Sequence, residues 1–364
     1  MVAKGATDLY ITVGHPPTLR VENELFFIKR EPMEAEDVRE VVNSILSNRQ
    51  LRYFETHMEM NMSIDMGSKG RFRVNIMRQR QMPALVIRRI FSKIPSFDEL
   101  RLEPVLESLA LENRGLILVT GITGSGKSTS LAAMIDKRNS QKSGHIITIE
   151  DPIEYFHSHK KSIVTQREVG VDTDSFSIAL KNALRQRPDV ILVGEIRDRE
   201  VMEQALMVSE TGHLCLATLH SSNSYQTIER IVGFFPKESY NQVRLNLSLN
   251  LRAIISQRLL PSVQGGMVVA MEIMLNEGHI RDLIHNGHLD KIKDVMEQNS
   301  KQGMLTFDMS LIRLYQEGLI DAPTAIQQAD KPSDMKMKIQ QVDLGEKGSL
   351  HRLDTSLLQI SDSE

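Results

Sequence analysis

Residues 121–129 read GITGSGKST, a stretch whose glycines, lysine and hydroxyl residues are spaced for binding phosphate. Gly121, Gly126, Lys127 and Ser128 complete the pattern G-x-x-x-x-G-K-[ST]. In this pattern backbone N–H groups at a helix start surround the phosphates, the lysine reaches the β- and γ-phosphates, and the hydroxyl ligates Mg²⁺. An apolar strand pattern precedes the stretch and a helical pattern follows it, as this chemistry requires. The residues predicted to contact nucleotide are Gly121, Thr123, Gly124, Ser125, Gly126, Lys127, Ser128 and Thr129.

Two acidic groups follow apolar runs that are predicted to be strands. Glu195 comes after DVILV, and the run EDPIE at 150–154 comes after HIITI. The carboxyl ends of parallel strands meet at the edge where a phosphate loop lies, so these acids are expected beside the phosphates. One carboxylate there can polarise the attacking water, and another can order the Mg²⁺ shell through water. Gly194 stands where the second acidic motif of a nucleotide hydrolase usually has an aspartate, which raises the question of how the metal is held.

Two histidines, His213 and His220, bracket the apolar run LCLAT. A histidine beside a γ-phosphate can sense or stabilise it, and we include both as candidates for the site. A packed core histidine is the alternative at either position, and the residues alone leave it open. His157 and His159 resemble a pair of metal ligands only in spacing, because no further ligand cluster lies near them in the sequence.

Six arginines crowd into residues 71–89, and three interpretations compete for them. They can form a charged strand face, a nucleic-acid patch, or a source of positive charge for a nucleotide. The nucleic-acid interpretation ranks last, because exposed aromatics are not interleaved and the formal net charge is −3. The six residues are Arg71, Arg73, Arg78, Arg80, Arg88 and Arg89.

The elements that must position these residues divide by pattern. Alternating apolarity over 8–28 predicts a hairpin or two strands, the apolar spacing in 33–57 predicts a helix, and strand-like segments follow up to residue 90. We therefore predict an N-terminal α+β domain over 1–92. Residues 93–114, with two prolines and mixed polarity, are predicted to be a linker with a short helix.

A different pattern begins at residue 115. Short apolar runs separated by helix-length segments are typical of strands buried on both faces in a parallel sheet. After residue 235 the pattern is mostly helical, with one more strand candidate at MVVAMEIM. We predict an α/β fold, with a domain over 115–330 that carries the phosphate loop and ends in a helical part. Residues 331–364 are polar and are predicted to be a flexible tail, or one ordered only against a partner.

Composition narrows the class of protein. The chain has 364 residues, 41% of them hydrophobic and 25% charged, which is an ordinary globular composition. Its single cysteine, Cys215, excludes a disulfide framework or a cysteine-based zinc site within one chain. No stretch approaches the ~20 apolar residues that span a bilayer, so we expect a cytoplasmic protein, with peripheral contact to a membrane complex left open.

Together these motifs resemble the type II/IV secretion ATPase superfamily, and within it the type IV pilus retraction ATPases of the PilT/PilU group. The resemblance extends to about residue 330. Its motifs are KGATDLYITVGHPP, RFRVN, GITGSGKST, IITIEDPIEYFH, LRQRPDVILVGEIRD, TGHLCLATLHSSNSYQTIERI and HIRDLIHNGH. The last of these, at 279–288, looks like the AIRNLIRE segment of retraction members.

The resemblance implies a fold and a site. It implies an N-terminal PAS-like domain, a RecA-like P-loop domain, and a homohexamer that hydrolyses ATP between the two domains as they close. Carried over by motif, the catalytic residues are Glu195, Glu154 and His220, with Arg73 and Arg88 reaching the nucleotide. Arg230 looks like a further arginine of the nucleotide site. Glycine before the glutamate is usual in this superfamily, so Ser128 is expected to be the one direct protein ligand of Mg²⁺.

The departures from the family pattern bear on function. His279, Asp282, His285 and Asn286 replace the Ala, Asn, Arg and Glu of the AIRNLIRE segment, and the tail beyond residue 330 is long. Both features look more like the PilU branch, whose members are thought to work alongside a primary retraction motor. Assembly and type II secretion ATPases usually carry a four-cysteine zinc motif, which this chain cannot supply.

The resemblance predicts an ATP-driven motor for type IV pilus retraction and twitching motility, at the inner face of the cell membrane. Its expected partners are copies of itself, a pilus platform protein in the inner membrane and a primary retraction ATPase. Three alternatives stay open: an ATP-binding adaptor whose own hydrolysis is dispensable, a pilus assembly or secretion ATPase, and a DNA translocase. No nucleic acid is expected.

Overall fold

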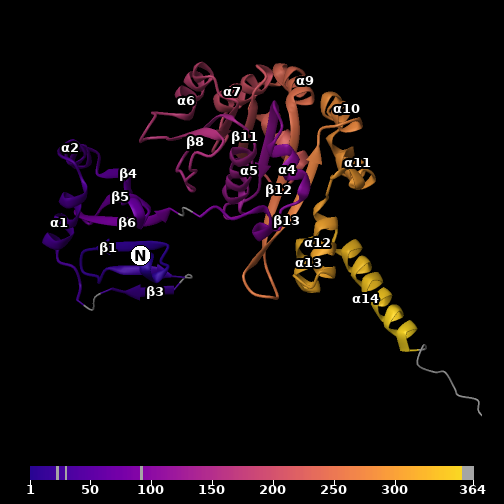
Figure 1. The fold of residues 1–364 in the computed structure, drawn as a ribbon, viewed down its shortest axis with the longest axis horizontal. Helices are drawn as coiled ribbons and strands as arrows, with labels where there is room; N and C mark the ends of the chain where they lie inside the picture. Colours follow the sequence, from indigo (N-terminus) through magenta and orange to yellow (C-terminus); the bar gives the residue numbers. More distant parts are fainter. Residues whose placement is uncertain (22–23, 29–30, 91–92, 355–364) are drawn as a thin grey trace, which may run out of the picture. The chain divides into compact units, whose positions relative to one another are not determined.

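The computed structural model describes residues 1–21, 24–28, 31–90 and 93–354 (Figure 1). The chain divides into two compact units. Unit 1 consists of Met1–Ile94 and Asn139–Pro188, and unit 2 consists of Pro95–Arg138 and Asp189–Glu364. Unit 1 therefore includes a segment that the sequence pattern assigns to the second domain. The domain boundaries given above stay a prediction.

Unit 1 contains a six-stranded antiparallel sheet in the order β3-β2-β1-β6-β5-β4. Its N-terminal stretch holds three strands where one hairpin or two strands were predicted. The bounds are β1 Asp8–Thr12, β2 Thr18–Val21, β3 Glu24–Phe27, β4 Glu59–Asp65, β5 Arg71–Gln79 and β6 Met82–Ile90.

Two helices cover part of this sheet, α1 Ala35–Ile45 and α2 Asn48–His57. The sequence predicted one helix here. Ser47 separates the two because its side chain caps the start of α2, accepting from the backbone N–H of Gln50. Apolar residues of both helices, including Val38 and Phe54, pack with strand residues in one buried cluster.

The second part of unit 1 carries a parallel pair of strands, β8 Gly144–Glu150 and β9 Ser162–Glu168. It also contains α6, Phe176–Ala183. The Ser63 hydroxyl on β4 donates to the Glu168 carboxylate at 3.3 Å, and the Arg71 guanidinium lies 4.3 Å from the centre of the Phe156 ring. These contacts join the segment after β8 to the N-terminal sheet.

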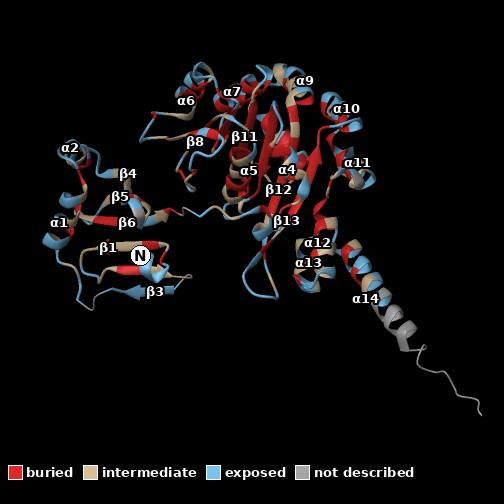
Figure 2. Cartoon of the chain, viewed as in Figure 1, coloured by how far each residue is buried: buried red, intermediate tan, exposed pale blue. Residues whose placement is uncertain are grey.

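Unit 2 is built on a sheet whose strands lie in the order β13-β12-β7-β11-β10. The three strands β7, β10 and β11 are buried along their whole length, which agrees with their continuous apolar runs (Figure 2). Strands β10, β11, β7 and β12 run parallel, and β13 pairs antiparallel with β12. The bounds are β7 Gly115–Thr120, β10 Val190–Val193, β11 Leu214–Leu219, β12 Leu251–Pro261 and β13 Met267–Leu275.

The expectation of a mostly helical pattern after residue 235 is wrong for β12. This strand carries Ser256 and Gln257 side by side in its interior, and both are buried. Buried polar residues interrupt the apolar run by which an interior strand is recognised from sequence. The strand hydrogen-bonds to both neighbours, so the tertiary sheet decides its conformation.

Helices surround this sheet and form the C-terminal part of unit 2. None of the helices in the described ranges is long and apolar enough to cross a membrane. The helices are α3 Phe97–Leu100, α4 Pro104–Ala110, α5 Lys127–Gln141, α7 Arg199–Glu210, α8 Ser224–Gly233, α9 Tyr240–Asn250, α10 His279–Asn286, α11 Ile292–Gln298, α12 Phe307–Gln316, α13 Ala322–Gln328 and α14 Pro332–Asp354.

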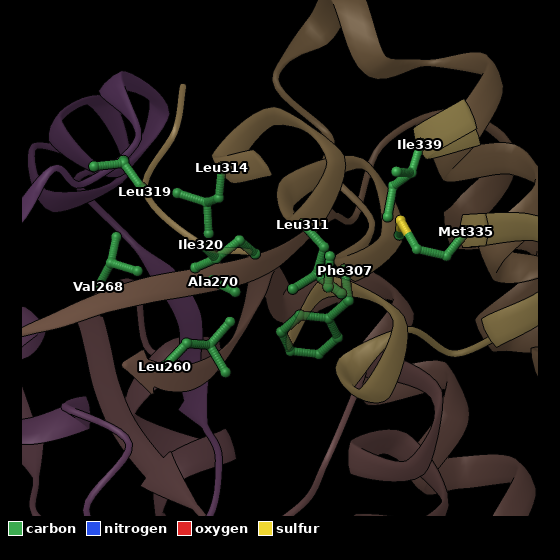
Figure 3. Close-up of a cluster of buried hydrophobic side chains, with 11 residues drawn as sticks. Leu260, Val268, Ala270, Phe307, Leu311, Leu314, Leu319, Ile320, Met335 and Ile339 are labelled. Carbon is green, nitrogen blue, oxygen red and sulfur yellow. The ribbon is translucent and has the colours of Figure 1, made fainter. Parts of the chain in front are cut away.

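Helix α14 occupies most of the segment for which a flexible tail was predicted. Its residues Met335 and Ile339 are buried in a cluster with Phe307 and Leu311 of α12 (Figure 3). Part of the segment for which a flexible tail was predicted is therefore a helix that packs in the core of unit 2. Two apolar residues four positions apart among lysines are too short a pattern to predict a packed helix from sequence. The surface against which they pack is formed by α12 and α13. Residues 355–364 of the predicted tail lie outside the described residues.

Replacing Ile339 by Ala is expected to lower the free energy of unfolding of unit 2. The side chain is 5% exposed, and deleting a buried isoleucine down to Cβ costs about 2–5 kcal/mol. The matched control is Met337→Ala on the same helix, because Met337 is 56% exposed. Urea unfolding compares the two variants. Equal, small losses would show that α14 does not contribute to the folded core.

Candidate nucleotide site

The phosphate loop connects β7 to α5 in unit 2. Strand β7 ends at Thr120 and helix α5 begins at Lys127, so the first turn of α5 presents its backbone N–H groups at the loop. The Lys127 Nζ donates to the carbonyl oxygens of Gly121 and Ile122, each at 2.9 Å. The predicted strand, loop and helix are all present in the order that phosphate binding requires.

Gly121 is the glycine of this loop at which a side chain would clash with neighbouring atoms. Its φ is +148°, and a Cβ built on it would lie 2.4 Å from the Ser125 Oγ and 2.6 Å from the Gln257 carbonyl oxygen. Gly124 and Gly126 have φ values of +81° and +89° with open space around them. At these two positions the left-handed backbone, rather than crowding, favours glycine.

Glu195 lies in the loop after β10 and meets His220, which follows β11. The His220 Nε2 lies 3.0 Å from the Glu195 Oε1, and the Arg197 Nε donates to the Glu195 Oε2 at 2.7 Å. The Glu195 side chain is 19% exposed and that of His220 is 37% exposed. The structure thus brings two of the predicted catalytic residues together at the carboxyl ends of neighbouring parallel strands.

The backbone on either side of Glu195 is hydrogen-bonded to β11. The Thr218 hydroxyl donates to the Gly194 carbonyl oxygen, and the Ile196 N–H donates to the Thr218 carbonyl oxygen at 2.9 Å. These bonds fix the direction in which the loop leaves the sheet. Sequence reasoning missed the role of Arg197, although its position two residues after the acid was a usable signal.

A cavity of about 500 Å³ opens at this edge of the sheet. One wall is the start of the phosphate loop, and the other is His220 with the first turns of α8. The structure therefore places Arg230, a predicted nucleotide contact, opposite the loop. The lining residues are Gly121, Ile122, Thr123, His220, Ser221, Ser222, Gln226 and Arg230.

A second cavity of about 410 Å³ also borders the loop. Ser125, Gly126 and Thr129 line it, together with apolar side chains such as Leu259 and Met267. Both cavities border the phosphate loop, so together they offer room for the phosphate and nucleoside parts of one ligand.

The structure does not bring His213 to the phosphate loop of the same chain, and its predicted contact with nucleotide stays a prediction. His213 precedes β11, and its carbonyl oxygen accepts from the Gly115 N–H at the start of β7. The two strands are parallel and in register, with Leu219 opposite Thr120. His213 therefore lies at the amino edge, about 20 Å from the loop at ~3.3 Å per strand residue.

Arg73 and Arg88 share one face of the sheet in unit 1. They are direct partners in the β5–β6 register. The Arg88 Nε donates to the Asp8 Oδ1 at 2.8 Å, and this bond raises the pKa of Arg88 above its usual value, to which the charge of Glu154 adds. Asp8 is buried and was missed from sequence. An acid on the strand that pairs with β6 becomes informative only once the register is known.

The acids of the EDPIE run lie in two different environments. Glu150 is half-buried at the end of β8, and the loss of solvent around its carboxylate raises its pKa to about 7. It accepts hydrogen bonds from the Thr148 Oγ1 at 2.6 Å and the Gln166 Nε2 at 3.3 Å. Glu154 is exposed. Of the two glutamates, Glu154 has the accessible carboxylate that a role in the site requires.

The residues present fit a bound magnesium ion of the kind expected from the sequence. Ser128 lies on the first turn of α5 and is half-buried, and Mg²⁺ beside phosphates usually takes one or two protein oxygens and keeps several waters. Within the described ranges, no group of three or more His, Cys, Asp or Glu side chains could hold a metal by itself.

Comparison with known proteins decides the family. A family model described as Type II/IV secretion system protein matches residues 41–304. The chain belongs to this family. Type IV pilus ATPase PilU of Pseudomonas aeruginosa is 46% identical over 366 residues, covering 100% of this chain and 96% of the relative. The PilT retraction ATPase of the same organism is 42% identical over 331 residues, covering 91% of this chain and 96% of PilT.

A solved structure of the family has the same fold. The crystal structure of the pilus retraction motor PilT with bound ADP matches with a TM-score of 0.87 and 43% sequence identity, covering 92% of this chain and 96% of that chain. The predicted resemblance to the PilT/PilU group is confirmed, as is the α/β fold class with a helical C-terminal part.

Proposed function

We propose that this protein is an ATP-hydrolysing motor that drives type IV pilus retraction alongside a primary retraction ATPase. The observation that carries the proposal is the meeting of the phosphate loop, His220 and Arg230 around one cavity, with Glu195 held 3.0 Å from His220. The similarity to PilU over the whole chain supports the retraction role.

Each residue has a distinct role in the proposed hydrolysis. The N-terminus of α5 and the Lys127 ammonium bind the β- and γ-phosphates, and Glu195 orients the attacking water. His220 and Arg230 face the transferred phosphoryl group, and Arg73, Arg88 and Glu154 of unit 1 act on the bound nucleotide. Ser128 would hold Mg²⁺, which neutralises phosphate charge.

The proposed assembly is a homohexamer at the inner face of the cell membrane. Such a ring would act on an inner-membrane platform protein of the pilus. Similarity to pilus ATPases supports this placement, and the twitching motility protein of Neisseria gonorrhoeae is 41% identical over 88% of this chain.

An accessory role is the second candidate, and α14 is the observation that favours it. The PilT relative covers 91% of this chain and PilU covers 100%, so a stretch about as long as the region from α14 onward falls outside the PilT match. Exposed His279 and Asp282 on α10 also depart from the segment of retraction members. In this role the chain binds ATP and joins a partner's ring.

Retraction measured in cells tests the proposed function. Deleting this gene while the primary retraction ATPase is kept is expected to weaken pilus retraction, and a parental copy is expected to restore it. A strain that carries only this ATPase then tests its dependence on the partner, and we expect little or no retraction there. Unchanged retraction after the deletion would contradict the proposal.

A further inference from the structure

A row of buried polar side chains crosses three strands of unit 2. Thr120 ends β7, Ser256 lies opposite it on β12, and Glu272 lies opposite Ser256 on β13. The Thr120 Oγ1 donates to the Ser256 Oγ at 2.9 Å. All three residues are buried. Polar groups in a sheet interior are costly unless they are hydrogen-bonded, so this row needs partners outside the sheet.

Glu272 finds its partners at the start of α8. Its Oε1 accepts from the Ser224 backbone N–H and from the Ser224 Oγ, each at 2.7 Å. The residue is 4% exposed, and burial raises its pKa, an effect that the two bonds from Ser224 oppose. A carboxylate at a helix N-terminus also interacts favourably with the helix dipole. Glu272 is thus anchored to the first residue of α8.

Helix α8 carries one wall of the phosphate-loop cavity. Gln226 and Arg230 line that cavity together with residues 121–123 of the loop. Ser221, which also lines it, is joined to the helix because its Oγ lies 2.5 Å from the Thr227 Oγ1. Ser224 and Arg230 are separated by six residues, about 9 Å along a helix. A shift of the first turn of α8 would therefore move the arginine relative to the loop.

We infer that Glu272 is a positioning residue that holds α8, and with it Gln226 and Arg230, at the distance from the phosphate loop that hydrolysis requires. The row Thr120–Ser256–Glu272 starts at the residue before the loop and ends at the helix opposite it. The same strand register thus locates both walls of the cavity. This inference rests on the proposed function, because it assumes that Arg230 faces a transferred phosphoryl group.

Turnover and nucleotide binding in purified variants test this role. Glu272→Leu removes both acceptors and is expected to lower kcat for ATP by about tenfold or more, since small misplacement of a catalytic group carries costs of this size. The KM for ATP and the affinity for ADP, measured with a fluorescent ADP analogue, are expected to stay within about threefold. Glu272→Gln keeps one acceptor oxygen and is expected to lose less turnover than the leucine variant.

A double variant separates positioning from general stability. If Glu272 acts through Arg230, Glu272→Leu combined with Arg230→Ala should lose no more than about twofold beyond Arg230→Ala alone. The matched control is Asn276→Leu, another buried polar residue one residue beyond β13, whose Nδ2 donates to the Ser248 and Leu251 carbonyl oxygens instead of to α8. Its kcat is expected to match the parent, even where its melting temperature falls.

Three results would overturn the inference. The first is an unchanged kcat in Glu272→Leu, and the second is an equal kcat loss in Glu272→Leu and Asn276→Leu. The third is a kcat loss in the double variant that equals the product of the losses in Glu272→Leu and Arg230→Ala. Failure of the proposed function would give a different result. The Lys127→Ala variant would then release phosphate from ATP at the same rate as the parent protein.

Discussion

Glu195→Gln is expected to reduce phosphate release from ATP by about 10²–10⁴-fold, the contribution of a positioned general base. Gln keeps the size of the side chain and an oxygen that can still face His220, whose Nε2 lies 3.0 Å from the native carboxylate. The amide cannot accept a proton from the attacking water. Nucleotide binding is therefore expected to persist while turnover is lost.

The measurement is phosphate release at saturating ATP, with nucleotide affinity recorded in parallel. Glu203→Gln is the matched control, because Glu203 forms an exposed pair with Arg199 on α7 and such pairs contribute little. Its turnover should equal that of the parent. Hydrolysis by Glu195→Gln at the parental rate would remove Glu195 from the mechanism and shift the role of base to another acid.

Lys127→Ala is expected to abolish pilus retraction driven by this protein. The Lys127 Nζ now bridges two carbonyl oxygens of the loop, and its ammonium is the cation that the loop supplies to the β- and γ-phosphates. Without it, both ATP affinity and stabilisation of the transferred phosphoryl group should fall. The assay is complementation of a deletion strain with the variant gene.

The control for this variant lies on the same helix. Lys137 lies about three turns further along α5 and pairs with Glu107, so Lys137→Ala should restore retraction like the parent. Full restoration by Lys127→Ala would show that turnover is dispensable. The accessory role, in which this chain binds to a partner's ring, would then replace the motor role.

Much of the nucleotide site could be predicted from local sequence. The strand, loop and helix around residues 121–129 are contiguous, so their geometry follows from short-range backbone preferences and glycine positions. The apolar runs of β7, β10 and β11 were recognisable because strands buried on both faces have no polar face to interrupt them. Parallel strand order then placed Glu195 and His220 at the edge of the sheet that carries the loop.

Contacts between distant segments could not be predicted in this way. The choice between His213 and His220 required the direction of β11, since the two residues occupy opposite ends of one strand. Asp8 and Arg88 are 80 residues apart, and Glu272 and Ser224 are 48 apart. Such pairs depend on the register between strands, which the pattern of residues along one sequence does not reveal.

Two elements, β12 and α14, could not be predicted from local sequence. Strand β12 carries buried Ser256 and Gln257, and α14 carries only a short apolar pattern, so neither has a strong local signal. Each is stabilised by neighbours that come from elsewhere in the chain, β7 and β13 for the strand and α12 for the helix. Local sequence specified the phosphate-binding chemistry because that chemistry is made by consecutive residues. The partners of Glu195, Arg88 and Glu272 depended on tertiary packing, because buried polar groups are satisfied by whatever groups the fold places beside them.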